Sequence, residues 1–126
     1  MSRGAEGFEG RIALITGGSR GIGRALAFSL AERGTIPVIN YRRNEEAAAE
    51  TLRGIEERGV EGVAVRADLE QVPEIERMFS EVEERFGRLD FFVSNAAASN
   101  FRSIMELKPH NLERTFNFFV ERLSPP

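Results

Sequence analysis

The sequence predicts an α/β fold in which helices cover both faces of a parallel sheet. Short apolar runs alternate along the chain with longer amphipathic runs, and this alternation implies parallel strands joined by right-handed crossovers. A glycine-rich turn stands directly between the first apolar run and the first amphipathic run. The 126 residues are 41% hydrophobic and 29% charged, which is an ordinary balance for one globular domain.

The first two elements are a strand over residues 11–16 and a helix over residues 21–33. The strand is nearly all apolar, as expected of a strand that is buried on both faces. The helix is predicted to end at Gly34. Its predicted apolar face consists of Ile22, Ala25, Leu26 and Leu30.

The second strand and the second helix are predicted over residues 35–41 and 44–58. Pro37 has no N–H group, so we expect this strand to pair only from Val38 onward. The helix is expected to be capped at its start by Asn44 and to carry acidic residues in its first turn, where the helix dipole favours them.

The remaining predicted elements are a strand over residues 60–66, a helix over 73–86, a strand over 89–94 and a helix over 111–123. The helix over 73–86 has apolar residues at helical spacing and stops at Gly87. The closing Ser-Pro-Pro sequence cannot continue the last helix.

Composition excludes several classes of function. The net charge of −3 gives no general attraction to nucleic acid or to membranes. The absence of cysteine excludes disulfides and thiolate catalysis, and the single histidine, His110, leaves no histidine cluster, so we expect no metal site. No apolar stretch approaches the roughly 20 residues that span a bilayer. We predict a cytoplasmic protein with a loose lead-in over residues 1–10 and one domain over residues 11–126.

The most informative segment is the turn Thr16-Gly17-Gly18-Ser19-Arg20-Gly21-Ile22-Gly23. Glycines here allow a tight turn, a close approach of the backbone to a pyrophosphate, and close packing of the helix on the sheet. The helix then offers free N–H groups and its positive dipole end to the phosphates. The alternative is a tight turn that binds no ligand. The expected cofactor-binding residues of the turn are Gly17, Ser19, Arg20, Gly21, Ile22 and Gly23.

The T-G-x-x-x-G-x-G spacing of this turn resembles the short-chain dehydrogenase/reductase family. Further motifs fit in order, each near the expected strand end: Asp68-Leu69, Gly87-Arg88-Leu89-Asp90 and Ser94-Asn95-Ala96-Ala97. The resemblance covers about residues 10–117. It implies a Rossmann-like sheet, a nicotinamide dinucleotide, and hydride transfer to or from a carbonyl or enoyl substrate. Met105-Glu106-Leu107 and Asn95-Ala96-Ala97-Ala98-Ser99 are similar to the enoyl-acyl-carrier-protein reductase branch.

The resemblance also implies roles for residues that follow the third and fourth strands. It places Asp68 and Leu69 beside the adenine, with the alternative that Asp68 is the N-cap of the next helix. It places Asn95, Ala96 and Ala97 near the ribose, and Asn95 is expected to hold backbone across the sheet edge.

The expectations for Thr16, Asp90 and Ser94 do not involve the cofactor directly. Thr16 is expected to pin the glycine turn to a neighbouring strand rather than to touch the cofactor. Asp90 is expected to be structural. Ser94 stands where the resembled family usually has asparagine, so the local bond made by that asparagine is not expected here.

The residues at the end of the second strand favour NADP(H) over NAD(H). An NAD site usually has an acid about 20 residues past the glycine turn, which bonds the ribose 2′-OH. No acid stands between Glu32 and Glu45, and the strand instead ends in Tyr41-Arg42-Arg43. An acid would repel a 2′-phosphate, whereas an arginine pairs with it. The alternative is that Arg42 and Arg43 are solvated loop charges.

The residues that transfer the hydride in the resembled family are not found in this sequence. The family uses a tyrosine, a lysine whose charge favours the phenolate, and a serine on the fifth strand. Tyr41 is the only tyrosine and is expected at the adenosine end, while Lys108 is the only lysine. For the asparagine of the family's fourth helix, Asn117 is a candidate, although the usual register falls nearer Phe119.

We therefore predict a domain truncated after about four strands. It would be the NADP(H)-binding half of a short-chain oxidoreductase, without turnover of its own. Its fourth strand would be an open sheet edge, at which a second copy or another partner is the expected occupant. The alternatives are a non-catalytic NADP(H)-binding module that associates with a partner, and a truncated product without function.

Overall fold

The computed structural model describes residues 7–19 and 21–95. Strands and helices alternate in the predicted order: β1 Ile12–Thr16, α1 Gly21–Glu32, β2 Ile36–Tyr41, α2 Glu45–Glu57, β3 Val63–Arg66, α3 Val72–Phe86 and β4 Phe91–Ser94. The helix predicted over residues 111–123 lies outside the described residues. None of the helices in this part of the chain is long and apolar enough to cross a membrane.

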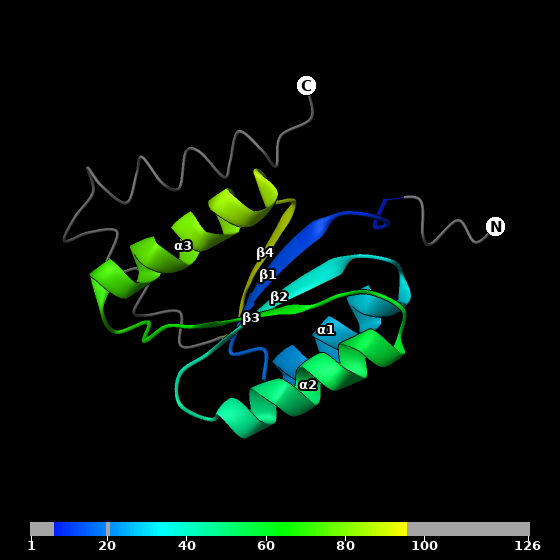
Figure 1. Cartoon of the computed structure of the whole chain (residues 1–126), viewed down its shortest axis with the longest axis horizontal. Helices are drawn as coiled ribbons and strands as arrows, with labels where there is room; N and C mark the ends of the chain where they lie inside the picture. Colours follow the sequence, from blue (N-terminus) through cyan, green and yellow to red (C-terminus); the bar gives the residue numbers. More distant parts are fainter. Residues whose placement is uncertain (1–6, 20, 96–126) are drawn as a thin grey trace.

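The strands form one parallel sheet in the order β3-β2-β1-β4. Figure 1 shows α1 and α2 together on one face of the sheet and α3 on the other face. The prediction of a parallel α/β sheet with helices on both faces is therefore confirmed. Because β2 and β3 lie on one side of β1 and β4 lies on the other, the carboxyl edge at β1 is the topological switch point, where open α/β sheets bind ligands.

Alternate residues of β1 contribute to two separate cores. Ile12 and Leu14 pack with residues of α3, whereas Ala13 and Ile15 pack with residues of α1 and α2. All four are buried, so neither face of β1 meets water. A strand in this position needs an unbroken apolar sequence, which explains the pattern predicted over residues 11–16.

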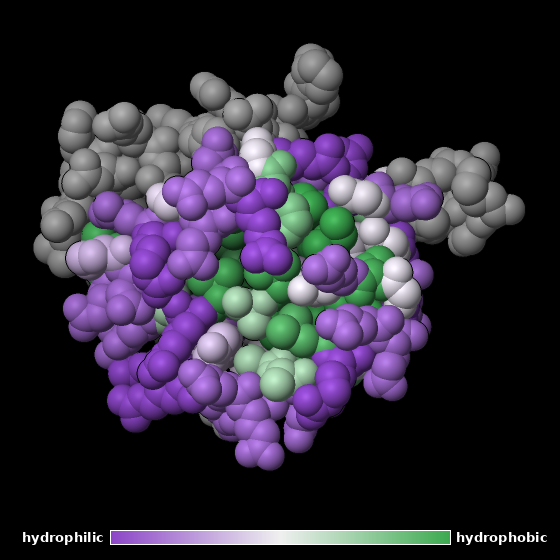
Figure 2. Space-filling model, in the orientation of Figure 1, coloured by the Kyte–Doolittle hydropathy of each residue, from purple (hydrophilic) through white to green (hydrophobic). Residues whose placement is uncertain are grey.

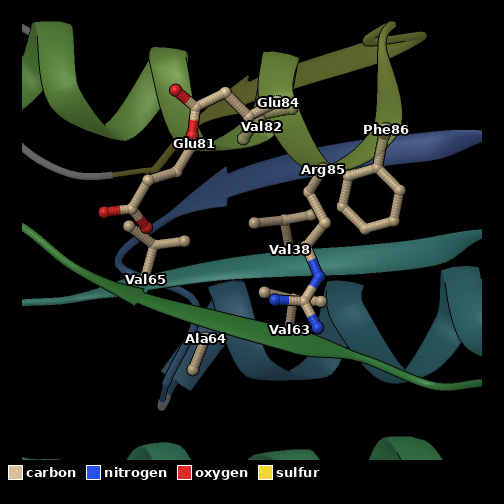
Figure 3. Close-up of a pocket in the computed structure, with 9 residues that line it drawn as sticks. All are labelled: Val38, Val63, Ala64, Val65, Glu81, Val82, Glu84, Arg85 and Phe86. Atoms are coloured by element: carbon tan, nitrogen blue, oxygen red, sulfur yellow. The ribbon is translucent and has the colours of Figure 1, made fainter.

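The α3 side of the sheet is incompletely covered near β3. Figure 2 shows apolar residues gathered in the middle of this view, surrounded by hydrophilic residues. A pocket of about 340 Å³ opens here between β2, β3 and α3. Figure 3 shows valines of both strands and of α3 in its wall, together with Glu81, Arg85 and Phe86 of α3. None of the residues that line this pocket belongs to the glycine turn.

The pairing of β2 with β1 starts before Pro37, so the prediction that it starts at Val38 is wrong. Ile36 already pairs with β1 and donates its N–H to the Arg11 carbonyl at 2.8 Å. Successive residues of a strand point their N–H groups to opposite sides, so the side that Pro37 cannot serve faces β3. The pairing of β3 begins only at Val63, opposite Val38. The proline therefore costs the sheet no ladder hydrogen bond.

The inward face of α1 also differs from the prediction. Leu30 is buried and Leu26 is partly buried, but Ala25 is exposed and Ile22 is 79% exposed. The buried residues of the helix are Gly23, Ala27, Leu30 and Ala31. Small residues let the helix backbone approach the sheet closely, and this orientation turns the larger Ile22 outward beside the glycine turn.

Residues 7–10 are attached to the sheet, in contrast to the loose lead-in expected over residues 1–10. The Phe8 carbonyl accepts a hydrogen bond from the Thr35 hydroxyl at 2.6 Å. The Phe8 ring packs against Phe91, with 5.7 Å between the ring centroids. The Phe8 ring and hydrogen bonds to the backbone of residues 8–10 together hold a segment whose polar, glycine-rich composition suggested no attachment.

Asp90 joins the start of β4 to the start of β1. Its carboxylate, which is 8% exposed, accepts the Ile12 N–H at 2.8 Å. The same carboxylate lies 3.2 Å from Arg11 and 3.0 Å from Arg88. The structural role predicted for Asp90 is therefore confirmed.

Replacing Asp90 with alanine is expected to lower the free energy of unfolding by about 1 to 3 kcal/mol, because a buried N–H loses its acceptor. Asp90→Asn keeps an acceptor for the Ile12 N–H and is expected to cost less. Urea unfolding followed by circular dichroism measures both variants. An Asp90→Ala chain as stable as the wild type would contradict this role.

Candidate functional site

The glycine turn between β1 and α1 needs glycine for both conformational and steric reasons. Gly17 and Gly21 have φ values of 64° and 61°, in the left-handed region that residues with a side chain rarely adopt. A Cβ at Gly23 would collide with the Gly17 carbonyl oxygen, and a Cβ at Gly18 would lie 2.8 Å from the Ile39 side chain. The turn is thus folded tightly against the start of α1 and against β2.

The side chain of Asn40, near the end of β2, holds the turn from one side. Its Oδ1 accepts the Gly17 N–H at 3.3 Å, and its backbone carbonyl accepts the Gly18 N–H at 3.1 Å. Its Nδ2 donates to the carbonyls of Val65 at 3.4 Å and Ala67 at 3.2 Å. Asn40 is 3% exposed, so water cannot replace these bonds easily. Asn40 therefore joins the carboxyl ends of β1, β2 and β3.

Thr16 and Asn95 hold the turn from the β4 side. Thr16 Oγ1 accepts the Asn95 N–H at 2.9 Å and donates to the Val93 carbonyl at 3.4 Å. Asn95 Nδ2 donates to the Gly17 carbonyl at 3.3 Å. These bonds confirm that Thr16 pins the turn to a neighbouring strand and that Asn95 holds backbone across the sheet edge.

A third support comes from α2, where the buried hydroxyl of Thr51 donates to the Ser19 carbonyl at 2.7 Å. The sequence pattern alone predicts no role for Thr51 or Asn40. Each residue does carry a signal, which is a polar side chain inside an apolar pattern. Thr51 shares its helix face with the buried Ala48 and Ile55, and Asn40 follows buried residues of β2.

The first turn of α1 differs in charge from that of α2. The first turn of α2 contains Glu45 and Glu46, and the Asn44 side chain accepts the Ala47 N–H at 2.9 Å, which confirms Asn44 as its cap. The first turn of α1 contains no acidic residue. A helix N-terminus carries free N–H groups and partial positive charge. In α1, no carboxylate of the first turn competes with an anion for these groups.

On the β3 side of the turn, charged side chains at the ends of β2 and β3 come together. Arg42 Nη2 lies 3.6 Å from an Asp68 carboxylate oxygen and 3.7 Å from a Glu70 carboxylate oxygen. The N-cap of α3 is Gln71, so the alternative that Asp68 is this cap is wrong. Asp68 Oδ1 instead accepts the Glu70 N–H at 3.0 Å. Leu69 points into the core on the α3 side of the sheet.

Two more of the expected site residues, Tyr41 and Arg43, lie in the described part of the chain. Tyr41 is partly buried and packs against the core on the α1 and α2 side, and Arg43 is exposed. The described ranges 7–19 and 21–95 contain no group of three or more His, Cys, Asp or Glu residues that could hold a metal ion. Four candidate residues, Arg20, Ala96, Ala97 and Asn117, lie outside the described residues.

Comparison with known proteins gives this geometry a context. The family model described as short chain dehydrogenase matches residues 11–121. The 1-cyclohexenylcarbonyl-CoA reductase of Streptomyces collinus is 51% identical over 106 residues, which are 84% of this chain and 38% of that protein. Hydroxynaphthalene reductase arp2 of Aspergillus fumigatus is 42% identical over 108 residues, which are 86% of this chain and 40% of that protein. The chain thus spans about two fifths of the length of these curated relatives.

Solved structures share the fold. The NADH-dependent reductase A1-R′ complexed with NAD aligns with a TM-score of 0.71 at 26% identity, over 94% of this chain and 54% of that chain. A protein from Burkholderia cenocepacia with bound NADP aligns with a TM-score of 0.66 at 28% identity, over 69% of this chain and 34% of that chain. The cofactors bound in these two structures differ by the 2′-phosphate.

Gly23→Ala is expected to lower stability by about 1 to 3 kcal/mol through overpacking, although alanine is the better helix former by about 1 kcal/mol. The new Cβ would meet the Gly17 carbonyl, whose position is fixed by the bond from Asn95. Gly54→Ala is the matched control, because its Cβ would meet the end of the Phe28 side chain at 2.6 Å rather than backbone, and a side chain moves aside at lower cost than backbone. Thermal unfolding compares the two variants, and equal losses would contradict this reasoning.

Proposed function

Because this chain belongs to the short chain dehydrogenase family, we propose that its glycine-turn edge binds the dinucleotide of an oxidoreductase and prefers NADP(H). The observation that carries this preference is Arg42, which follows β2 at the place where an NAD site usually has an acid. A guanidinium there pairs with a 2′-phosphate, whereas a carboxylate repels it.

The pyrophosphate is proposed to lie over the glycine turn and the start of α1. Gly21 is exposed, and a Cβ at this position would have no atom within 4 Å, so the backbone is accessible to a ligand here. The acid-free first turn of α1 supplies N–H groups and a positive dipole end to the phosphates. We assign the pyrophosphate contacts to Gly17, Ser19, Gly21, Ile22 and Gly23, and we propose that Arg20 approaches the 2′-phosphate from the side of the turn.

The two halves of the cofactor are proposed to lie on opposite sides of β1. The strand order puts β2 and β3 on one side, and there the adenosine half would meet Tyr41, Arg42, Arg43 and Asp68, together with the backbone of Leu69, whose side chain points into the core. The nicotinamide half would lie on the β4 side, where we assign its ribose to Asn95, Ala96 and Ala97. This division follows the rule that dinucleotides bind across the switch point of such sheets.

For the whole protein, we propose reduction of a carbonyl group or of a double bond conjugated to a thioester. The name 1-cyclohexenylcarbonyl-CoA reductase suggests a coenzyme A thioester as the substrate of this protein. The name hydroxynaphthalene reductase suggests instead a cyclic substrate without a thioester. When bound, the nicotinamide supplies the hydride. Tyr41, the only tyrosine in the sequence, ends β2 on the proposed adenosine side. This chain alone is therefore proposed to bind cofactor without turning over substrate.

NADPH is expected to bind this chain more tightly than NADH, and Arg42→Ala is expected to weaken NADPH by about 5- to 30-fold. The loss reflects one charge-assisted interaction at a half-exposed position. NADH affinity is expected to stay within about twofold, since NADH has no 2′-phosphate. Isothermal titration calorimetry with both cofactors measures this selectivity.

The matched control for Arg42→Ala is Arg53→Ala, which removes the same charge from an exposed position on α2. It is expected to leave the ratio of the two affinities unchanged. Equal affinities of the wild-type chain for NADPH and NADH would refute the proposed preference. An equal loss of both cofactors in Arg42→Ala would show that Arg42 does not face the 2′-phosphate.

The purified chain is expected to show no oxidation of NADPH in the presence of a simple ketone or an α,β-unsaturated coenzyme A thioester. The test uses a chain preparation that calorimetry has shown to bind NADPH. Absorbance of the reduced nicotinamide follows the reaction, and steady turnover above a heat-inactivated sample would contradict the proposal that this chain only binds cofactor.

A further inference from the structure

The guanidinium that carries the proposed NADP(H) preference already faces two carboxylates. Arg42 Nη2 lies 3.6 Å from Asp68 and 3.7 Å from Glu70. Both acids follow β3, far along the chain from Arg42. The segment between Glu32 and Glu45 contains no acid in sequence, but the fold brings acids to its arginine from another loop.

The loop that carries these acids is braced in this position. The Asp68 N–H donates to a Glu74 carboxylate oxygen at 2.9 Å, and the Glu70 N–H donates to Asp68 Oδ1 at 3.0 Å. On the other side, the Arg42 carbonyl accepts a hydrogen bond from Arg66 Nε at 3.2 Å. The backbones that carry Arg42 and the two acids are therefore held near one another by bonds that do not involve the Arg42 guanidinium.

We propose that Glu70 is a specificity-determining residue, whose carboxylate occupies the Arg42 guanidinium and thereby weakens discrimination in favour of NADP(H). This inference rests on the proposed function, because it assigns a modulating role beside the same cofactor site. A 2′-phosphate carries a charge of about −1.5 to −2 near neutral pH. To reach Arg42 it must displace a carboxylate from the guanidinium and must also approach that negative charge.

Glu70, rather than Asp68, is the residue that the phosphate displaces. The Glu70 side chain is 60% exposed, and its carboxylate makes no described contact other than the one to Arg42. The Asp68 side chain is 28% exposed, and its carboxylate also accepts the Glu70 N–H. Moving Asp68 would therefore break a bond within the loop, whereas Glu70 has only to rotate toward solvent.

Glu70→Gln is expected to strengthen NADPH binding by about two- to fivefold, which is the scale of one exposed ion pair. NADH binding is expected to be unchanged within error. Glu61→Gln is the matched control, because it removes the same charge from an exposed residue that precedes β3, at the opposite edge of the sheet. It is expected to change neither affinity. Calorimetry of the full chain with NADPH and with NADH gives both constants for each variant.

A double-substitution cycle separates the proposed pairing from general charge repulsion. In the Arg42→Ala chain, Glu70→Gln is expected to give a clearly smaller gain in NADPH affinity than in the wild type. Circular dichroism first shows that each variant is folded, as expected for exposed side chains. An equal gain in the two backgrounds overturns the pairing, and so does the absence of any gain in the wild-type background.

The readout for this inference is the change in the ratio of NADPH to NADH affinity on Glu70→Gln. The readout for the proposed function is the ratio in the wild-type chain. A wild-type chain that prefers NADH, but whose ratio shifts toward NADPH in Glu70→Gln, contradicts the proposed preference and supports the role of Glu70. A wild-type chain that prefers NADPH, and whose affinity ratio is unchanged by Glu70→Gln, supports the proposed preference and contradicts the role of Glu70. A chain that binds neither cofactor overturns both.

Discussion

Asn40 makes the side-chain hydrogen bonds that join the ends of β1, β2 and β3 at the carboxyl edge of the sheet. Its amide joins the Gly17 N–H, after β1, to the carbonyls of Val65 and Ala67, at the end of β3. In a buried environment each of these groups would be costly to leave without a partner, so the three strand ends behave as one unit. The shape of the glycine turn and the placement of the β3–α3 loop beside Arg42 both depend on this side chain.

The second constraint is the close approach of α1 to the glycine turn, which small residues make possible. Gly23 lies so near the Gly17 carbonyl that no side chain fits, and Ala27 continues the same buried face of α1. The helix can therefore begin directly against the turn, with its N–H groups at the switch point of the sheet. This packing leaves Ile22 exposed beside the turn. An exposed isoleucine at this place costs burial in the core but offers an apolar contact to whatever binds the turn.

Much of the fold was predictable because it depends on local patterns. Apolar periodicity and glycine positions predicted each of the described strands and helices, with errors of a few residues at their ends. The inward face of α1 was predicted only in part: Leu30 and Leu26 face the core as expected, but Ile22 and Ala25 are exposed, because the close packing of Gly23 and Ala27 sets the orientation of the helix. The roles of Asn40 and Thr51 were not predictable from periodicity. A polar residue in an apolar pattern marks a buried bond, but its partner is known only once distant segments are packed together.

The proposed cofactor site also depends on contacts that the sequence does not reveal, here electrostatic ones. No acid stands between Glu32 and Glu45 in the sequence. The electrostatic field at the Arg42 guanidinium is nevertheless set by the residues that lie near it in space. Asp68 and Glu70 arrive there from the far end of β3 because the parallel order β2-β3 puts both carboxyl ends at one edge. Because exposed pairs of this kind are weak, a phosphate can compete with them. Under the proposed function, selectivity at this edge is the difference between the ion pair of Arg42 with Glu70 and its ion pair with a 2′-phosphate. The sequence around Arg42 contains neither of these two partners.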